Sequence, residues 1–172
     1  MKALVTYYSL TGNTEKLARA IFDAIHIDKE LMPILDVKQT TGYDIIFVGF
    51  PVHAHSVPAK LLPFFKSLPA GQRIALFCTH GSLRSGQLPR QALEDAIGLS
   101  SRAKIVGTFN IRGRVDEQLL DTLMTQAEHR AWAVEAQGAV EHPTEVDLAD
   151  AREFAREMLA KISMQAALQK PR

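Results

Sequence analysis

A turn rich in hydroxyl groups lies near the amino terminus, between an apolar run and a stretch with helical periodicity. It reads Ser9-Leu10-Thr11-Gly12-Asn13-Thr14. A turn at the start of a helix exposes backbone N–H groups, the helix dipole favours an anion there, and hydroxyls donate further hydrogen bonds. The turn has no lysine and matches neither the Walker A loop nor the dinucleotide G-x-G-x-x-G pattern. It predicts a phosphate cradle, and the alternative is that these residues only cap a helix.

Three histidines stand where apolar runs end. His53 and His55 follow one run, and His80 ends another. An imidazole can stack on or hydrogen-bond to a cofactor, donate a proton near neutral pH, or bind a metal ion. The alternative is that they are exposed loop residues with no special role. No carboxylate or cysteine nearby completes a ligand set, so we predict no metal site, and we assign no catalytic residue.

Four arginines lie close to the ends of the later apolar runs: Arg84, Arg90, Arg112 and Arg114. They could meet the carboxylates or phosphates of a substrate, or an acidic protein partner. Ordinary solvated arginines are the equal alternative. Cys78 lies inside an apolar run and is expected to be a small core residue rather than a nucleophile.

Five apolar runs that favour strands alternate with stretches of helical period, which is typical of βαβ units and a parallel sheet. The predicted strands cover residues 2–8, 30–35, 44–50, 73–79 and 103–110. Runs such as 45–48 and 74–77 are continuously apolar, as expected where helices cover both faces of a sheet. Helices are predicted around 17–25, 58–67 and 89–97, with Pro63 either kinking the second or marking its first turn.

Two further helical stripes follow the last strand. One consists of Leu120, Met124, Ala127, Ala131 and Val134, and the other runs from Ala151 to Ile162, with Asp147 or a near neighbour as its cap. Residues 163–172 are expected to form a tail. In a sheet of order 2-1-3-4-5, the link over 36–43 must run back along the sheet and across one strand, a path on the order of 20 Å. About seven extended residues reach roughly 23 Å, so the link closes only without a proper helix.

Composition limits the possible classes of protein. The 172 residues suit one domain, and 20 basic against 19 acidic side chains argue against a nucleic-acid partner. A single cysteine excludes an internal disulfide and fits a reducing cytoplasm. No signal-peptide pattern opens the chain, and the most apolar run is too short to span a bilayer. We therefore expect a soluble, cytoplasmic protein with no membrane span.

Several segments resemble a known family. Ser9-x-Thr11-Gly12-Asn13-Thr14 closely resembles the FMN-phosphate loop of flavodoxins. Residues 43–52 are similar to the third strand and first flavin-flanking loop of these proteins, and residues 77–82 to the fourth strand and second flavin-flanking loop. The segment from His142 to Ala155 looks like the last helix of some shorter members. The resemblance covers roughly residues 2–162.

This resemblance implies a flavodoxin-like α/β three-layer sandwich, with a five-stranded parallel sheet in order 2-1-3-4-5 and helices on both faces. The domain would cover residues 1–162, followed by the tail 163–172. Ligands of such sheets sit beyond the carboxyl ends of the strands, where the strand order reverses. The implied cofactor is FMN. Its phosphate would be held by Ser9, Leu10, Thr11, Gly12, Asn13 and Thr14, and its ring flanked by Pro51, Val52, His53, Ala54, His55, Thr79, His80 and Gly81.

The chain departs from the family pattern in two ways. Flavodoxins often carry a glycine in the first flavin-flanking loop, whereas residues 51–56 contain none, and a non-glycine residue resists positive φ. Many flavodoxins that dock on basic partners are strongly acidic, whereas this chain is balanced.

The resemblance implies an electron carrier that takes electrons from a reductase or NAD(P)H and passes them to a redox protein partner. The alternative is an FMN enzyme that reduces a small acceptor, such as a quinone or tetrapyrrole, with electrons from NAD(P)H. A flavin-free binding domain of the same fold is the third possibility.

Overall fold

A five-stranded parallel sheet forms the centre of the computed structural model, which describes residues 1–168. The strand order is β2-β1-β3-β4-β5, as predicted. The strands are β1 (Lys2–Tyr7), β2 (Asp28–Pro33), β3 (Ile45–Pro51), β4 (Arg73–His80) and β5 (Lys104–Arg112). All neighbouring pairs are parallel, so the carboxyl ends of the strands meet at one edge.

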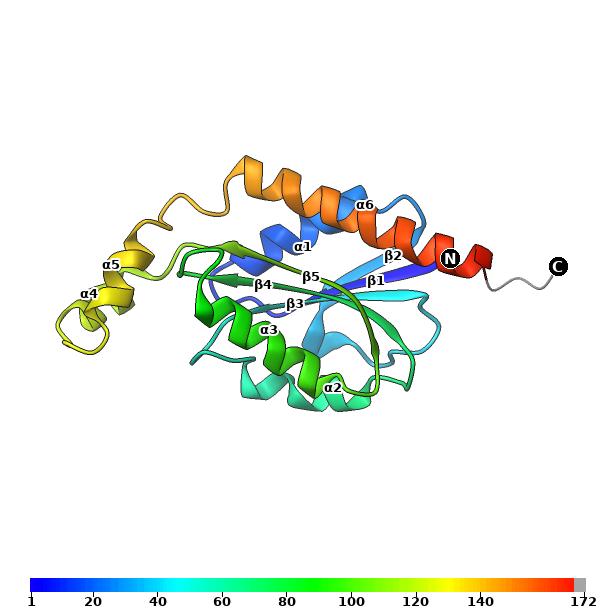
Figure 1. The fold of residues 1–172 in the computed structure, drawn as a ribbon, viewed down its shortest axis with the longest axis horizontal. Helices are drawn as coiled ribbons and strands as arrows, with labels where there is room; N and C mark the ends of the chain where they lie inside the picture. The colour runs from blue at the N-terminus through cyan, green and yellow to red at the C-terminus, as the bar shows by residue number, and fades with distance from the viewer. Residues whose placement is uncertain (169–172) are drawn as a thin grey trace.

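Helices cover both faces of the sheet, which confirms the predicted three layers (Figure 1). One face carries α1 (Asn13–Ala24) and α6 (Glu145–Leu168), and the other carries α2 (Leu62–Ser67) and α3 (Gln87–Leu99). Residues 45–50 of β3 are buried because they are covered from both sides. Phe47, for example, meets Phe154 of α6 edge to face at 6.2 Å between ring centroids.

The link from β2 to β3 and the start of α2 have the conformations that their sequences predict. The link from β2 to β3 contains only the 3-10 turn η1 (Ile34–Asp36), so it closes without a proper helix, as predicted. Pro63 lies in the first turn of α2, directly after the 3-10 turn η2 (Ala59–Leu61), and therefore marks a helix start rather than a kink.

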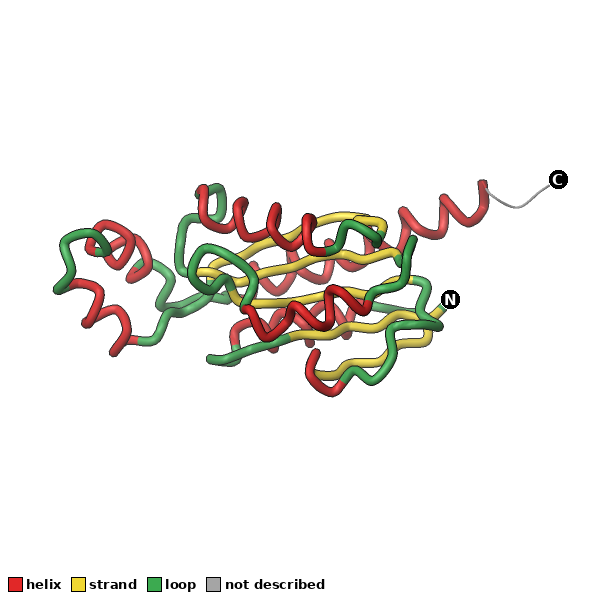
Figure 2. Tube along the Cα trace, turned by 90° about the horizontal axis from the view of Figure 1, so that it is seen from below, coloured by secondary structure: helices red, strands yellow, loops and turns green. Residues whose placement is uncertain are grey.

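Beyond β5 the chain leaves the sheet and forms a helical hairpin of α4 (Glu117–Met124) and α5 (Arg130–Gln137). Figures 1 and 2 show this hairpin projecting past the carboxyl ends of the strands. The predicted stripe from Leu120 to Val134 is therefore wrong as a single face. Leu120 is buried, whereas Val134 is 53% exposed and Ala133 is buried in its place. Folding back lets Leu120 pack against α5, and this tertiary contact overrides the helical period.

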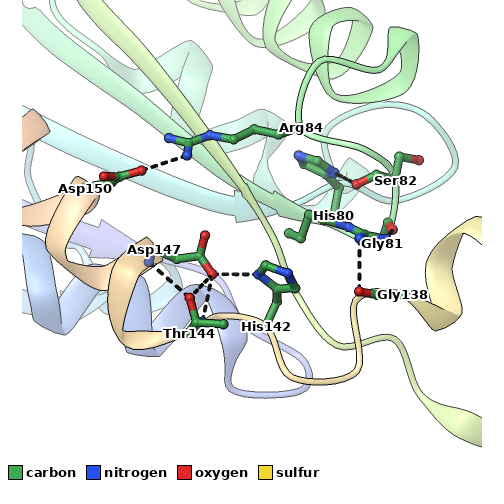
Figure 3. Close-up of polar contacts among 10 residues, drawn as sticks. His80, Gly81, Ser82, Arg84, Gly138, His142, Thr144, Asp147 and Asp150 are labelled. Carbon is green, nitrogen blue, oxygen red and sulfur yellow. Dashed lines mark hydrogen bonds and ion pairs between the residues drawn. The ribbon is translucent and has the colours of Figure 1, made fainter.

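The last helix begins and ends at places different from those expected. It starts at Glu145 and continues to Leu168, past the expected start of the tail; residues 169–172 of that tail lie outside the described part. Asp147 lies inside the first turn, and its carboxylate accepts hydrogen bonds from the N–H and hydroxyl of Thr144 (Figure 3). Thr144 is thus the residue that precedes the helix, and Asp147 reaches back to it as in a capping box. No helix within residues 1–168 is both long and apolar enough to cross a membrane.

Candidate functional site

The hydroxyl-rich turn lies at the carboxyl edge of the sheet and leads into α1. Gly12 takes a left-handed conformation with φ of 86° just before the helix, and the Ser9 hydroxyl accepts the Gly12 N–H at 3.1 Å. Within the described chain, no side chain caps the first turn of α1. Because the first N–H groups of a helix have no partner inside it, these donors are available to a ligand. The turn has the form of an anion site.

The chemistry of the turn fits a phosphate. Between Ser9 and Thr14 every polar side chain is a hydroxyl or an amide, so none carries negative charge. The first carboxylate is that of Glu15, which pairs with Arg19 of the same helix at 2.7 Å. A dianion at the turn would therefore meet donors and the positive end of α1, with no fixed negative charge in the turn itself.

The three predicted loops come together. Tyr8 N–H donates to Gly49 O, and Val52 N–H donates to Thr79 O, so the chain leaves β1, β3 and β4 side by side. The hydroxyls of Thr14 and Thr79 lie 2.8 Å apart and are buried, which joins the cradle to the end of β4. The backbone thus places residues 9–14, 51–52 and 79–81 at one edge, at the point where the strand order reverses.

Residues 51–56, predicted as the first flavin-flanking loop, form a self-contained turn. His53 and Ser56 exchange two backbone hydrogen bonds of 3.0 Å, leaving Ala54 and His55 at φ of 45° and 66°. The expectation that a loop without glycine avoids positive φ is therefore wrong, because a two-residue hairpin of this kind requires positive φ at both central residues. His53 and His55 are exposed on this turn.

His80 lies elsewhere, buried at the end of β4. Its Nδ1 lies 3.1 Å from the carbonyl oxygen of Ser82 and its Nε2 lies 2.9 Å from the side-chain oxygen of Asn110 on β5. Burial lowers the pKa of His80 below its ordinary value, and the hydrogen bonds to Asn110 and Ser82 offset only part of that shift. The ring therefore connects the loop after β4, through Nδ1, to β5, through Nε2, whereas the sequence could not distinguish it from His53 and His55.

The arginines noted in the sequence differ in their surroundings. Arg84 pairs with Asp150 of α6 at 2.7 Å (Figure 3) and lies over the Phe109 ring. Arg114 pairs with Glu117. Arg90 is exposed on α3. Cys78 is fully buried, and burial raises the pKa of its thiol, as expected of a core cysteine.

Arg112 has the most contacts of the four. Its guanidinium donates to three carbonyl oxygens, those of Gly81, Glu135 and Gly138, at 3.1, 2.6 and 3.0 Å. Two of these carbonyls belong to the end of α5, where a cation is favourable, and the third belongs to the loop after β4. Arg112 is therefore part of the protein framework.

The segments that lead into and out of the α4–α5 hairpin, which we call the hairpin root, also contact the cradle. The Asn13 side chain donates to Arg114 O at 2.7 Å, and Arg114 N–H donates to His142 O at 2.9 Å, which joins the two chain segments that lead to and from the hairpin. His142 in turn bonds the Asp147 carboxylate at 2.6 Å (Figure 3). Burial alone would raise the pKa of Asp147, but hydrogen bonds from Thr144 and His142 outweigh it and lower that pKa.

A cavity of about 570 Å³ adjoins the cradle. Its wall on one side is the start of α1, including Thr11, Asn13 and Lys16, and on the other side the hairpin root, residues 114–118 and 140–143. Sequence reasoning missed Lys16 and this wall, because the segments are about 100 residues apart. The Arg112-Gly113-Arg114 motif was the available signal.

Comparison with known proteins agrees with this architecture. The flavodoxin domain family matches residues 4–156 of the chain. The chain belongs to the flavodoxin family. A curated relative, the flavodoxin-like domain-containing protein BilS of Clostridioides difficile (strain CD3), is 28% identical over 176 residues, which cover 95% of this chain and 99% of that protein.

Solved flavodoxins share the fold. A flavodoxin from the domain Archaea has a TM-score of 0.63 and 20% identity, with 95% of this chain and 99% of that chain covered. The flavodoxin of Streptococcus pneumonia TIGR4 has a TM-score of 0.62 and 16% identity, with 94% and 99% covered. At these identities the likeness concerns the fold, and the flavodoxin family membership rests on the domain match.

Proposed function

We propose that this flavodoxin-family chain binds FMN and uses it to transfer electrons. The observation that carries the proposal is the uncapped start of α1, where Gly12 turns the backbone and the polar side chains of residues 9–14 carry no negative charge. Ser9, Leu10, Thr11, Gly12, Asn13 and Thr14 would hold the phosphate. The segments 51–55 and 79–81 would flank the ring, through their backbone and, on the first loop, through exposed histidines. When bound, the flavin supplies the redox chemistry.

The proposed role is that of a carrier between a reductase or NAD(P)H and a redox protein partner. The family match supports it, and among the solved relatives the Megasphaera elsdenii flavodoxin was determined in its two-electron reduced form. Exposure of the first loop gives a partner access to the edge where the ring would lie.

The test is FMN binding by the purified chain, followed by visible absorption and by titration. We expect wild type to bind FMN and Thr11→Asp to lose binding, because the new carboxylate would face the phosphate dianion while Thr11 is exposed and its replacement leaves the core intact. Thr41→Asp is the matched control, since it adds the same charge at an exposed threonine before β3, at the opposite edge. Unchanged binding by Thr11→Asp would contradict the proposed cradle, and a wild type that never binds FMN would favour a flavin-free binding domain.

A second candidate function is an FMN enzyme that itself reduces a small acceptor, such as a quinone or a tetrapyrrole, with electrons from NAD(P)H. The cavity of about 570 Å³ beside the cradle favours it, because its volume lies in the range of small-molecule sites. Its lining includes Lys16 and the Arg114–Glu117 pair together with the carboxylates of Asp116 and Glu141. Steady-state turnover with NAD(P)H and a small quinone would support the enzyme. Reduction that proceeds only through an added protein reductase would support the carrier.

A further inference from the structure

The loop after β4 is held by groups from outside its own strand. Trp132 Nε1 donates to the Ser82 hydroxyl at 2.8 Å, and Leu83 N–H donates to the Glu135 carboxylate at 2.7 Å. Together with the bond from Arg112 to Gly81 O, these contacts fix three consecutive residues of the loop. We call Arg112, Trp132 and Glu135 the clamp.

Packing reinforces the clamp. A Cβ added at Gly81 would lie 2.5 Å from Val115 Cγ2 and 3.1 Å from Ala136 Cβ, so the loop and the hairpin are in close contact there. Gly81 and Ser82 are buried although they belong to a loop. The atoms that a Cβ at Gly81 would meet belong to α5 and to the segment that leads into α4.

The clamp also lies on a path to the cradle. Arg112 ends β5, Gly113 N–H donates to His80 O, and Arg114 O accepts from Asn13 in the cradle. One short segment at the hairpin root therefore touches both the phosphate turn and the loop after β4. The hairpin is attached to the part of the protein where the flavin would bind.

We infer that the α4–α5 hairpin sets the conformation of the second flavin-flanking loop, with Arg112 and Trp132 as positioning residues for the flavin. This inference rests on the proposed FMN site. Arg112 bridges the carbonyl end of α5 and the loop, so displacement of the hairpin releases residues 81–83 from the geometry that the ring meets. Any molecule that moves the hairpin would thereby change flavin affinity and potential.

The test compares Arg112→Met with Arg130→Met. Arg130 is the matched control because its Nε also donates to a carbonyl oxygen, that of Met124, but within the hairpin. Hydrogen exchange of the flavin-free chain is measured first, and we expect residues 81–84 of Arg112→Met to exchange at least about tenfold faster than in wild type, with Arg130→Met like wild type there.

The flavin readouts follow on the same variants. With less pre-organisation of the loop, Arg112→Met should bind FMN about tenfold more weakly and show an altered visible circular dichroism and midpoint potential. Arg112→Lys keeps the charge at the end of α5 without the planar fork, so it should fall between wild type and Arg112→Met. Trp132→Phe, which removes the bond to Ser82 together with part of the ring volume beside Gly81, gives a milder change of the same kind if Arg112→Met does not fold.

The outcomes separate this inference from the proposed function. Wild-type exchange at residues 81–84 in both Arg112→Met and Trp132→Phe overturns the clamp. Faster exchange with wild-type FMN affinity, circular dichroism and potential overturns the positioning role. Failure of the wild-type chain to bind FMN overturns the proposed function instead, and the exchange measurement still reports whether the hairpin orders the loop.

Discussion

The segments after β3 and β4 leave the sheet side by side, yet they are held in opposite ways. The segment after β3 closes on itself between His53 and Ser56 and exposes both its histidines. The segment after β4 buries His80, Gly81 and Ser82 and depends on contacts from β5 and α5. The first is a local structure and the second a tertiary one.

This difference shows how one edge of a sheet can combine a turn closed by its own hydrogen bonds with a loop held by distant residues. A turn with few outside contacts can change conformation at low cost, whereas a loop bonded to a separate helical hairpin moves only when the hairpin moves. If FMN binds between the two as proposed, we expect the exposed turn to be the side that adapts to a partner. We expect the clamped loop to be the side that holds the ring in place.

The largest effect on stability is expected from adding a methyl group to the clamped loop, residues 81–83. Gly81→Ala places a methyl group 2.5 Å from Val115 and should reduce the free energy of unfolding by about 1–3 kcal/mol. Gly98→Ala is the control, because no atom lies within 4 Å of its added Cβ, and it should leave stability unchanged or slightly raised. Urea denaturation measures both. Equal stability of the two variants would show that the hairpin does not press on the loop.

A smaller effect of opposite sign is expected in the self-contained turn. Ala54 has φ of 45°, and relieving the strain of its Cβ outweighs the extra chain entropy of glycine, so Ala54→Gly should raise the free energy of unfolding by about 0.5 kcal/mol. Ala70→Gly provides the comparison, since Ala70 is an exposed turn residue outside the positive-φ region and should lose stability. A loss in both variants would mean that the turn does not hold Ala54 in the left-handed region.

The smallest effect concerns pH. The pKa of His80 lies below its ordinary value of 6.5 in the folded chain, so as the pH falls below that value the unfolded chain takes up the proton first. The contribution of His80 to stability is therefore complete above about pH 6.5 and is lost as the pH falls through the folded pKa. Thermal unfolding between pH 7 and 5 should show a weaker pH dependence for His80→Gln than for wild type.

His53→Gln serves as the control for this measurement, because His53 lies exposed on the other loop. It should keep the wild-type pH dependence over the same range. An identical pH profile for His80→Gln and wild type would contradict the burial of the His80 ring in the folded state.

Much of the sheet could be predicted because its signals are local. Continuous apolar runs such as 45–48 require cover on both faces, and the short link before β3 leaves no room for a helix. The prediction of a single stripe from Leu120 to Val134 was wrong because it, too, used only a local signal. A helical period describes one continuous helix, whereas the hairpin buries Leu120 against a second helix, which the period does not reveal.

The candidate site also has a part that local sequence predicts and a part that it does not. The turn over 9–14 was recognisable because its chemistry lies in six consecutive residues. The separate roles of His53 and His80, and the use of Arg112 within the framework, depend on partners far along the chain, such as Asn110 for His80 and Glu135 for Arg112.

The sequence by itself determined the alternation of strands and helices, the two helical layers and the position of a turn with the donors of an anion site, because each follows from periodicity or adjacent donors. The strand order followed from the resemblance to flavodoxins. Only the tertiary structure decided that a helical hairpin projects from the carboxyl edge and holds the loop after β4. That arrangement depends on hydrogen bonds between residues 31 to 52 positions apart, such as Trp132 and Ser82, and no local pattern records which distant donor will meet which acceptor.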